Sequence, residues 1–83
     1  MSACVYILFS QFLNKYYVGS TPDIDRRLAE HNRGKEKFTK TGTPWLLVYE
    51  EMFIDLKEAR TRETYIKRQK SRKYIESLIN SVK

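Results

Sequence analysis

The sequence predicts an α+β fold, because segments with strand composition alternate with segments that carry helix signals along its 83 residues. Three short runs, at residues 4–10, 15–20 and 45–53, are rich in β-branched and aromatic residues, as strands are. Start signals for helices occur at Thr21, Asp55 and Ser71. We therefore expect one small domain, residues 1–83, with the order ββαβα followed by a C-terminal helix.

The first two runs form a predicted hairpin, because residues 11–14 between them have polar ends typical of a turn. A turn centred between Gln11 and Phe12 would place Tyr6 directly opposite Tyr17. Directly opposed residues share a face of the sheet, so both hydroxyls are expected on one side. A register shifted by one residue would separate them. Gly19 ends the second run, where the chain turns or approaches another group closely.

The first helix is predicted over residues 21–34. Thr21 can cap it, Pro22 suits its first position, and Asp23 complements the positive end of the helix dipole. Gly34 is a natural stop. Its buried side carries Ile24 and Leu28 at helical spacing.

Arg27 and His31 stand one turn apart at the edge of that apolar stripe. A lone arginine in such a place usually extends its charged end to solvent, and a lone histidine is usually a satisfied, half-buried ring. A functional role at the sheet is the alternative for both residues. Residues 35–43 then read as a basic loop, and a third strand follows over 45–53.

The second helix begins at a capping box over residues 55–58. Its apolar stripe contains Leu56, Ala59 and Ile66, and Glu63 occupies the position that completes the stripe. A carboxylate in such a place is costly to bury unless it is paired or binds a cation. Glu63 is therefore expected to form a salt bridge, for example to Arg27, or to hold a metal ion.

The third helix is predicted to start at a Ser71 cap and to gather apolar residues on one face, namely Tyr74, Ile75, Leu78, Ile79 and Val82. That face would pack on the domain or on a protein partner.

The formal net charge of +6 indicates a polyanionic partner, nucleic acid above all. The charge is concentrated in two runs, a loose one at Lys35, Lys37 and Lys40 and a denser one at Lys67, Arg68, Lys70, Arg72 and Lys73. Either run alone could be an ordinary solvated surface. Two runs that flank a candidate site favour binding of nucleic acid, DNA more than RNA.

Hydrolysis of a phosphodiester requires an activated water molecule and stabilisation of charge on the phosphoryl oxygens. Arginine matches phosphate oxygens with a fixed fork of donors, and one carboxylate can hold a Mg²⁺ ion that keeps most of its waters. Tyr6, Tyr17, Arg27 and Glu63 could meet these needs with one metal ion. The sequence has no aspartate-rich two-metal cluster, no glycine loop for phosphate and no zinc-binding Cys/His pattern.

These features together resemble the GIY-YIG nuclease family, whose name records two strand tripeptides. Residues 4–6, Cys-Val-Tyr, stand for the first tripeptide, and residues 17–19, Tyr-Val-Gly, stand for the second. The spacing onward to Arg27, His31 and Glu63 fits the pattern of the family, and the likeness covers roughly residues 4–70. Cys4 replaces the glycine of the family name but removes no catalytic group.

The resemblance implies a role for each candidate residue. Tyr6 or Tyr17 would act as general base or orient the water, and Arg27 would bind the scissile phosphate. His31 would assist proton transfer or contact the phosphate, and Glu63 would hold Mg²⁺ or Mn²⁺. The resemblance also implies a small three-stranded antiparallel sheet flanked by helices.

The function expected from this resemblance is that of a divalent-metal-dependent endonuclease acting on branched, nicked or distorted DNA. A binding module without catalysis is the alternative, with Glu63 as a structural ion-pair partner. A third is an adaptor in DNA repair that docks through its C-terminal helix. With one cysteine, no secretory signal and no apolar run of membrane-spanning length, a soluble cytoplasmic protein is expected.

Overall fold

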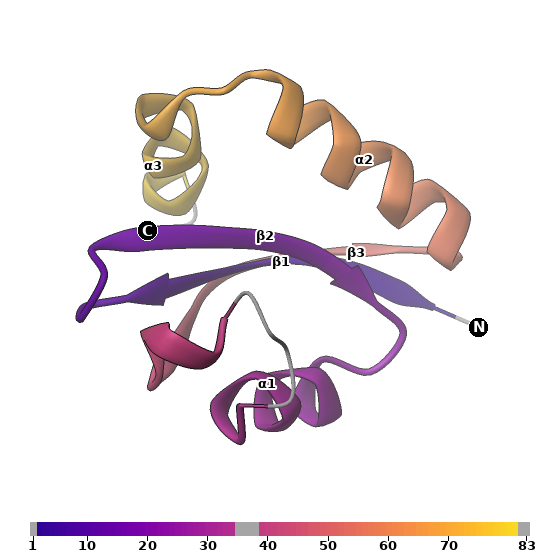
Figure 1. Cartoon of the computed structure of the whole chain (residues 1–83). Coiled ribbons are helices and arrows are strands. Elements are labelled where there is room, and N and C mark those ends of the chain that lie inside the picture. Colours follow the sequence, from indigo (N-terminus) through magenta and orange to yellow (C-terminus); the bar gives the residue numbers. More distant parts are fainter. Residues whose placement is uncertain (1, 35–38, 82–83) are drawn as a thin grey trace.

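The computed structural model, which describes residues 2–34 and 39–81, contains three strands and three α-helices in the expected order (Figure 1). The strands are β1 (Ala3–Ser10), β2 (Lys15–Thr21) and β3 (Trp45–Phe53). The helices are α1 (Ile24–Asn32), α2 (Leu56–Arg68) and α3 (Arg72–Asn80), and a short 3₁₀ helix, η1 (Lys40–Gly42), lies in the segment predicted as loop. The predicted α+β class is confirmed.

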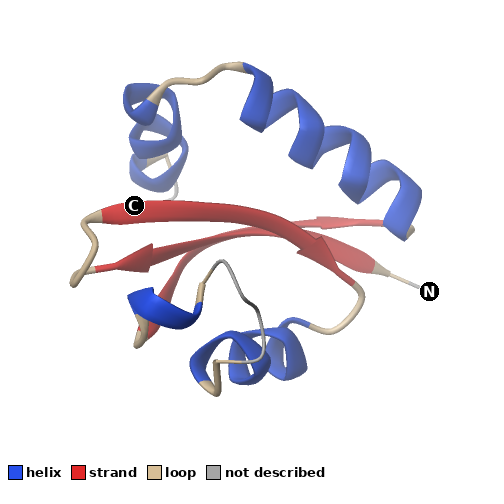
Figure 2. Ribbon diagram, in the orientation of Figure 1, coloured by secondary structure: helices blue, strands red, loops and turns tan. Residues whose placement is uncertain are grey.

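The strands form one antiparallel sheet in the order β2-β1-β3, so β1 is central and both other strands are edges. Helices α2 and α3 cover one face, and α1 and η1 lie against the other (Figures 1 and 2). Because both faces of β1 are covered, nearly all of its residues are buried, and its sequence is continuously apolar rather than alternating.

Two apolar clusters hold these layers together. Val5 and Ile7 of β1 pack with Ala59 and Ile66 of α2 on one face. On the other face, Tyr6 and Leu8 pack with Trp45 and, from α1, with Ile24 and Leu28. Alternation along β1 therefore sends Tyr6 to the α1 face.

The apolar face of α3 packs within the domain. Tyr74, Ile75 and Leu78 contact the cluster beneath α2, and Ile79 lines a hollow beside Tyr16 of β2. Val82 lies outside the described residues. Of the two possibilities left open by the sequence, packing on the domain is the one observed.

The predicted register of the hairpin is wrong by two residues. Tyr6 lies opposite Gly19, and Tyr17 lies opposite Leu8. The turn uses four residues, its start fixed by donation from the Leu13 amide to the Ser10 hydroxyl at 3.0 Å and its end by Asn14 at a φ of 54°. Because the shift is even, Tyr6 and Tyr17 still project to the same face, as predicted.

The start of α1 also differs from the prediction. Thr21 is the last residue of β2, and Pro22 precedes the helix rather than opening it. Asp23 is the cap, its carboxylate accepting from the Arg26 amide at 3.2 Å, while the Thr21 hydroxyl accepts from the Asp23 amide. Pairing of Thr21 with Cys4 keeps it in the sheet, so capping passes to the next suitable side chain.

The caps predicted for the other helices are confirmed. The Asp55 carboxylate accepts from the Glu58 amide at the start of α2, and the Ser71 hydroxyl accepts from the Tyr74 amide at the start of α3. No helix in residues 2–34 and 39–81 is long and apolar enough to cross a membrane.

Candidate active site

Three aromatic rings form the centre of the candidate site on the α1 face. The ring centroids of Tyr6 and Tyr17 lie 6.3 Å apart. The imidazole of His31, from α1, stands edge-on to both, at 4.9 Å from the Tyr17 ring and 6.0 Å from the Tyr6 ring. Three residues that the sequence singled out from three elements are thus in direct contact.

Gly19 of β2 leaves room for the end of the Tyr6 side chain, which occupies the space that a side chain at position 19 would need. A Cβ built at Gly19 would stand 2.5 Å from Tyr6 Oη and 2.6 Å from its Cζ. The phenol therefore extends across β2 toward its free edge. Of the two reasons for Gly19 that the sequence allowed, close approach is the one observed.

Gly19→Ala is expected to displace the Tyr6 ring and to destabilise the domain by about 1–3 kcal/mol, as overpacking of a close-packed interior does. Tyr6 is 1% exposed and has little room to retreat. Denaturant melts of Gly19→Ala, Tyr6→Leu and the double variant measure the coupling. The alanine should cost little once the ring is absent, and additive effects would contradict the assignment.

His31 is completely buried, more than the half-buried ring expected from the sequence. Its Nε2 lies 3.1 Å from Tyr6 Oη, and its Nδ1 lies 2.8 Å from Thr39 Oγ1. Thr39 is held in turn because its carbonyl accepts from the indole N–H of Trp45 at 2.6 Å. With Nδ1–H donating to Thr39, Nε2 can accept from the Tyr6 hydroxyl, so these contacts suit a neutral imidazole.

Tyr6 is electrostatically linked to Arg27 and Glu63. Burial raises the pKa of Tyr6 to about 12, and the charges of Tyr17 and Glu63 add to the rise. The Arg27 guanidinium, which can donate to the phenol oxygen, opposes this shift of the pKa. Tyr6 is therefore a neutral phenol at ordinary pH.

Arg27 lies beside this cluster with a side chain 27% exposed, and it donates to the Glu30 carboxylate at 3.1 Å. It also lines a small hollow of about 160 Å³ with residues at the start of α1, including Thr21 and Arg26. Its guanidinium thus stands between the buried phenol and solvent, where a phosphate could reach it.

Glu63 reaches the same edge of the sheet from α2, on the opposite face. Its carboxylate accepts from the Ser20 hydroxyl of β2 and pairs with Lys67 at 2.6 Å. The Lys67 ammonium is also 6.0 Å from the centroid of the Tyr17 ring. Because β2 is an edge strand, groups from both faces can meet around it.

The ion pair observed for Glu63 is thus with Lys67, one turn along the same helix, where the sequence suggested Arg27. No pattern in the sequence predicted the polar partners Ser20 and Thr39. Ser20 stands beside a motif residue, and alternation places it on the α2 face. Thr39 carries no signal of its own, since its segment has no periodicity.

A groove of about 300 Å³ runs along β2 beside Glu63. It is lined by residues of β2, of α2 and of the start of α3, namely Tyr16, Tyr17, Val18, Ile66, Lys67, Lys70, Ser71 and Ile75. It adjoins the tyrosine–histidine cluster through Tyr17, so ligand atoms in it could reach the candidate groups.

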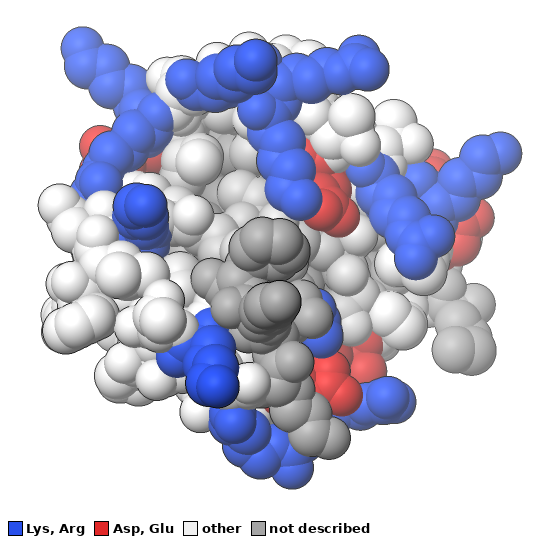
Figure 3. Space-filling view, in the orientation of Figure 1, with Lys and Arg blue, Asp and Glu red and all other residues white. Residues whose placement is uncertain are grey.

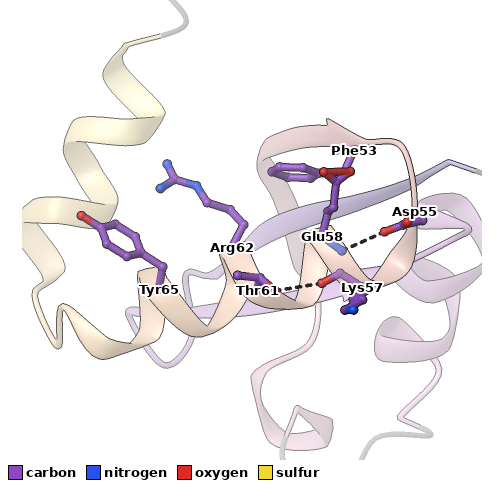
Figure 4. Close-up of a pocket in the computed structure, with 7 residues that line it drawn as sticks. All are labelled: Phe53, Asp55, Lys57, Glu58, Thr61, Arg62 and Tyr65. Carbon is purple, nitrogen blue, oxygen red and sulfur yellow. Dashed lines mark hydrogen bonds between the residues drawn. The ribbon is translucent and has the colours of Figure 1, made fainter.

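A larger hollow of about 650 Å³ lies elsewhere, between Phe53 at the end of β3 and the side of α2 that carries Arg62 and Tyr65 (Figure 4). It contains none of the candidate catalytic residues. Two cations line it, Lys57 and Arg62, and Arg62 is paired with Glu51 at 3.0 Å. The groove along β2 is lined by Tyr17 and by Lys67, the ion-pair partner of Glu63, so it is the better candidate despite its smaller volume.

Basic side chains gather over α2 and α3 on the face shown in Figure 3. Lys40, Lys67, Arg68, Lys70, Arg72 and Lys73 are all exposed, whereas Lys35 and Lys37 lie outside the described residues. The Arg72 guanidinium donates to the carbonyl and side chain of Asn14, pairs with Glu76 and stacks on Tyr16. Arg72 therefore also ties α3 to the hairpin turn.

Within residues 2–34 and 39–81 there is no group of three or more His, Cys, Asp or Glu side chains that could enclose a metal ion. Glu63, with a side chain 19% exposed, offers one carboxylate at the rim. A Mg²⁺ ion that keeps several waters needs no more than one or two carboxylates from the protein. The donor set therefore suits a hydrated Mg²⁺ or Mn²⁺ ion rather than zinc.

Comparison with known proteins gives the chain a family context. The family model of the GIY-YIG catalytic domain matches residues 2–75. The UPF0213 protein SH2523 of Staphylococcus haemolyticus is 48% identical over 67 residues, which cover 76% of this chain and 82% of that protein. UPF0213 protein YazA of Bacillus subtilis is 40% identical over 72 residues, covering 82% and 73% of the two chains.

A further relative is the UPF0213 protein of Streptococcus pneumoniae, 45% identical over 56 residues. That match covers 66% of this chain and only 57% of the longer relative. Among solved structures, the solution NMR structure of the UPF0213 protein BH0048 from Bacillus halodurans superposes with a TM-score of 0.60. It is 36% identical, and the match covers 96% of this chain and 84% of that one.

Proposed function

Because the chain belongs to the GIY-YIG family, a nuclease family, we propose that it is a divalent-metal-dependent endonuclease that hydrolyses phosphodiester bonds in DNA. One observation carries the proposal. The Tyr6–His31 hydrogen bond, the Tyr17 ring, Arg27 and Glu63 converge at one free edge of the sheet. Residues separated by up to 57 positions in the sequence thereby form one set suited to phosphoryl chemistry.

Glu63 is the proposed metal ligand. When bound, a Mg²⁺ or Mn²⁺ ion supplies positive charge that stabilises the phosphoryl oxygens and the departing oxygen. The Ser20 hydroxyl donates to one carboxylate oxygen and would hold the carboxylate in place, as groups bonded to metal ligands commonly do.

Tyr6 and His31 are the proposed proton relay. The Tyr6 phenol does not need to ionise, because its oxygen can take a proton from the attacking water as its own proton passes to His31 Nε2, 3.1 Å away. The imidazolium so formed is stabilised by donation from Nδ1–H to the Thr39 hydroxyl. A pKa of about 12 for Tyr6 favours this relay over a stored phenolate.

Tyr17 and Arg27 complete the set. Tyr17 is more exposed than Tyr6 and is proposed to orient the attacking water from the groove. Arg27 is proposed to bind the non-bridging oxygens of the scissile phosphate through its planar fork of donors.

Nicked, branched or otherwise distorted DNA is the proposed substrate class. Forcing a regular duplex into a bent geometry costs on the order of 1–6 kcal/mol and must be offset by extra contacts. A single small domain offers few such contacts. Already distorted DNA avoids that cost, and the exposed cations at Lys40, Arg68, Lys70 and Lys73 would hold its backbone.

The direct test is cleavage of nicked, branched and regular DNA substrates, each labelled at one end, with Mg²⁺, Mn²⁺ or EDTA. We expect cleavage of the distorted substrates that requires the metal ion. Gel-shift binding of the same substrates without cleavage under any metal condition would instead identify a binding module. A Tyr6→Phe, Tyr17→Phe double variant is the background control for contaminating nuclease.

A further inference from the structure

Lys67 was expected to be one cation in a nucleic-acid-binding run, but its position in the structure is different from that of its neighbours. Its ammonium is 2.6 Å from a carboxylate oxygen of Glu63 and 6.0 Å from the centroid of the Tyr17 ring. It also lines the groove along β2. Lys67 is therefore placed between the proposed metal ligand, the proposed water-orienting phenol and the space available to a ligand.

Both oxygens of Glu63 are occupied in this arrangement. The Ser20 hydroxyl donates to one and the Lys67 ammonium to the other. A divalent cation that binds the carboxylate competes directly with an ammonium at hydrogen-bond distance, since both need the same lone pairs and carry the same sign of charge.

The Lys67–Glu63 contact is also easily exchanged. The Lys67 side chain is 51% exposed while that of Glu63 is 19% exposed, and water around the ammonium weakens such an i,i+4 pair on a helix. The flexible stem of lysine lets its ammonium swing to another anion at little cost. A phosphate group in the groove would be such an anion.

We infer that Lys67 is an exchangeable counter-ion of Glu63, which nucleic-acid phosphate draws away and which thereby couples metal binding to nucleic-acid binding. The inference rests on the proposed role of Glu63 as metal ligand. Without nucleic acid the carboxylate is neutralised by Lys67 and binds the metal ion weakly. With phosphate in the groove, Lys67 turns to the phosphate, and Glu63 becomes available to the cation.

The test is binding of Mn²⁺ followed by the loss of the free-ion electron paramagnetic resonance signal, with Glu63→Gln as the background. Lys67→Gln should tighten Glu63-dependent Mn²⁺ binding by roughly threefold to tenfold, because it removes both a competing ion pair and a like charge. Lys67→Arg keeps the ion pair and the positive charge, so it should not tighten Mn²⁺ binding. Lys57→Gln, which removes an equal charge from the far end of the same helix, should leave the affinity unchanged.

A second arm adds a phosphorothioate hexathymidylate, which resists cleavage. The oligonucleotide should tighten Mn²⁺ binding by the wild type. The Mn²⁺ affinities of the wild type and Lys67→Gln should then agree within about twofold, because bound phosphate has already drawn Lys67 away from Glu63 in the wild type. Thermal melts should show that all variants fold.

Two results overturn the inference in distinguishable ways. If the wild type, Lys67→Gln and Lys57→Gln show equal Glu63-dependent Mn²⁺ binding, Lys67 is not a counter-ion that controls the metal ligand. That result would not contradict the proposed nuclease function. No Glu63-dependent binding in any variant, with or without the oligonucleotide, removes the metal ligand itself and the proposed function with it.

Discussion

Glu63→Gln is expected to lower metal-dependent DNA cleavage by roughly 10²- to 10⁴-fold, while the domain stays folded. Charge stabilisation by a bound metal ion is worth several kcal/mol in the transition state, and each 1.36 kcal/mol corresponds to about a factor of ten in rate. The amide oxygen of glutamine still accepts from Ser20, but it lacks the charge that holds a divalent cation. The measurement is single-turnover cleavage of nicked DNA over a range of Mg²⁺ and Mn²⁺ concentrations.

The stability of Glu63→Gln separates a metal ligand from a structural ion pair. Loss of the half-exposed pair with Lys67 should cost less than about 1 kcal/mol. Glu58→Gln is the matched control, because Glu58 is an exposed acid on the same helix that lines the other hollow. A loss of about 1–3 kcal/mol in Glu63→Gln, together with no cleavage by the wild type, would favour the binding module.

The sequence indicated that Glu63 needs a polar or charged partner, because it is a carboxylate in an otherwise apolar stripe of its helix. Helical periodicity placed a carboxylate in line with Ala59 and Ile66, both of which are buried, and such a placement calls for a partner. The identity of the partner was not predictable. Ser20 reaches Glu63 across 43 positions in the sequence, and that contact depends on how α2 lies over the edge of the sheet.

The hairpin shows how much a pattern can fix. Successive side chains of a strand point to opposite faces, so a register that is wrong by an even number still gave the correct expectation that Tyr6 and Tyr17 share a face. The register depends on the turn, and the turn uses the Ser10 hydroxyl and a positive φ at Asn14. Those local contacts decide between pairings that differ by two residues and preserve every face.

The order and caps of the helices were the most predictable features, since each depends on a few adjacent residues. The exception is the start of α1, where pairing of Thr21 in the sheet overrode its capping propensity. Burial of His31 was underestimated for a similar reason. The amphipathic stripe showed where the ring lies on α1, but Thr39 and the Trp45 side chain, which enclose it from a separate segment, do not enter that pattern.

Arg27→Lys is expected to reduce cleavage by roughly 10²- to 10³-fold, the effect of removing one aligned donor from a developing anionic charge. Lysine keeps the positive charge but replaces a planar fork by a single ammonium, which cannot bind two phosphate oxygens side by side. Arg27→Ala should be worse still, since it removes the charge as well. Because Arg27 is partly exposed and pairs with Glu30 on the same helix, neither change should unfold the domain.

Arg26→Lys is the matched control for this prediction. Arg26 is the adjacent residue and pairs with the same Glu30 carboxylate, but its side chain is 76% exposed. If bidentate phosphate binding is the role of Arg27, Arg26→Lys should cleave at nearly the wild-type rate while Arg27→Lys is severely slowed at saturating DNA. Equal and modest effects of both substitutions, seen only as weaker DNA binding, would contradict this role. Arg27 would then be one cation of a general electrostatic surface, and other groups would stabilise the charge on the phosphate.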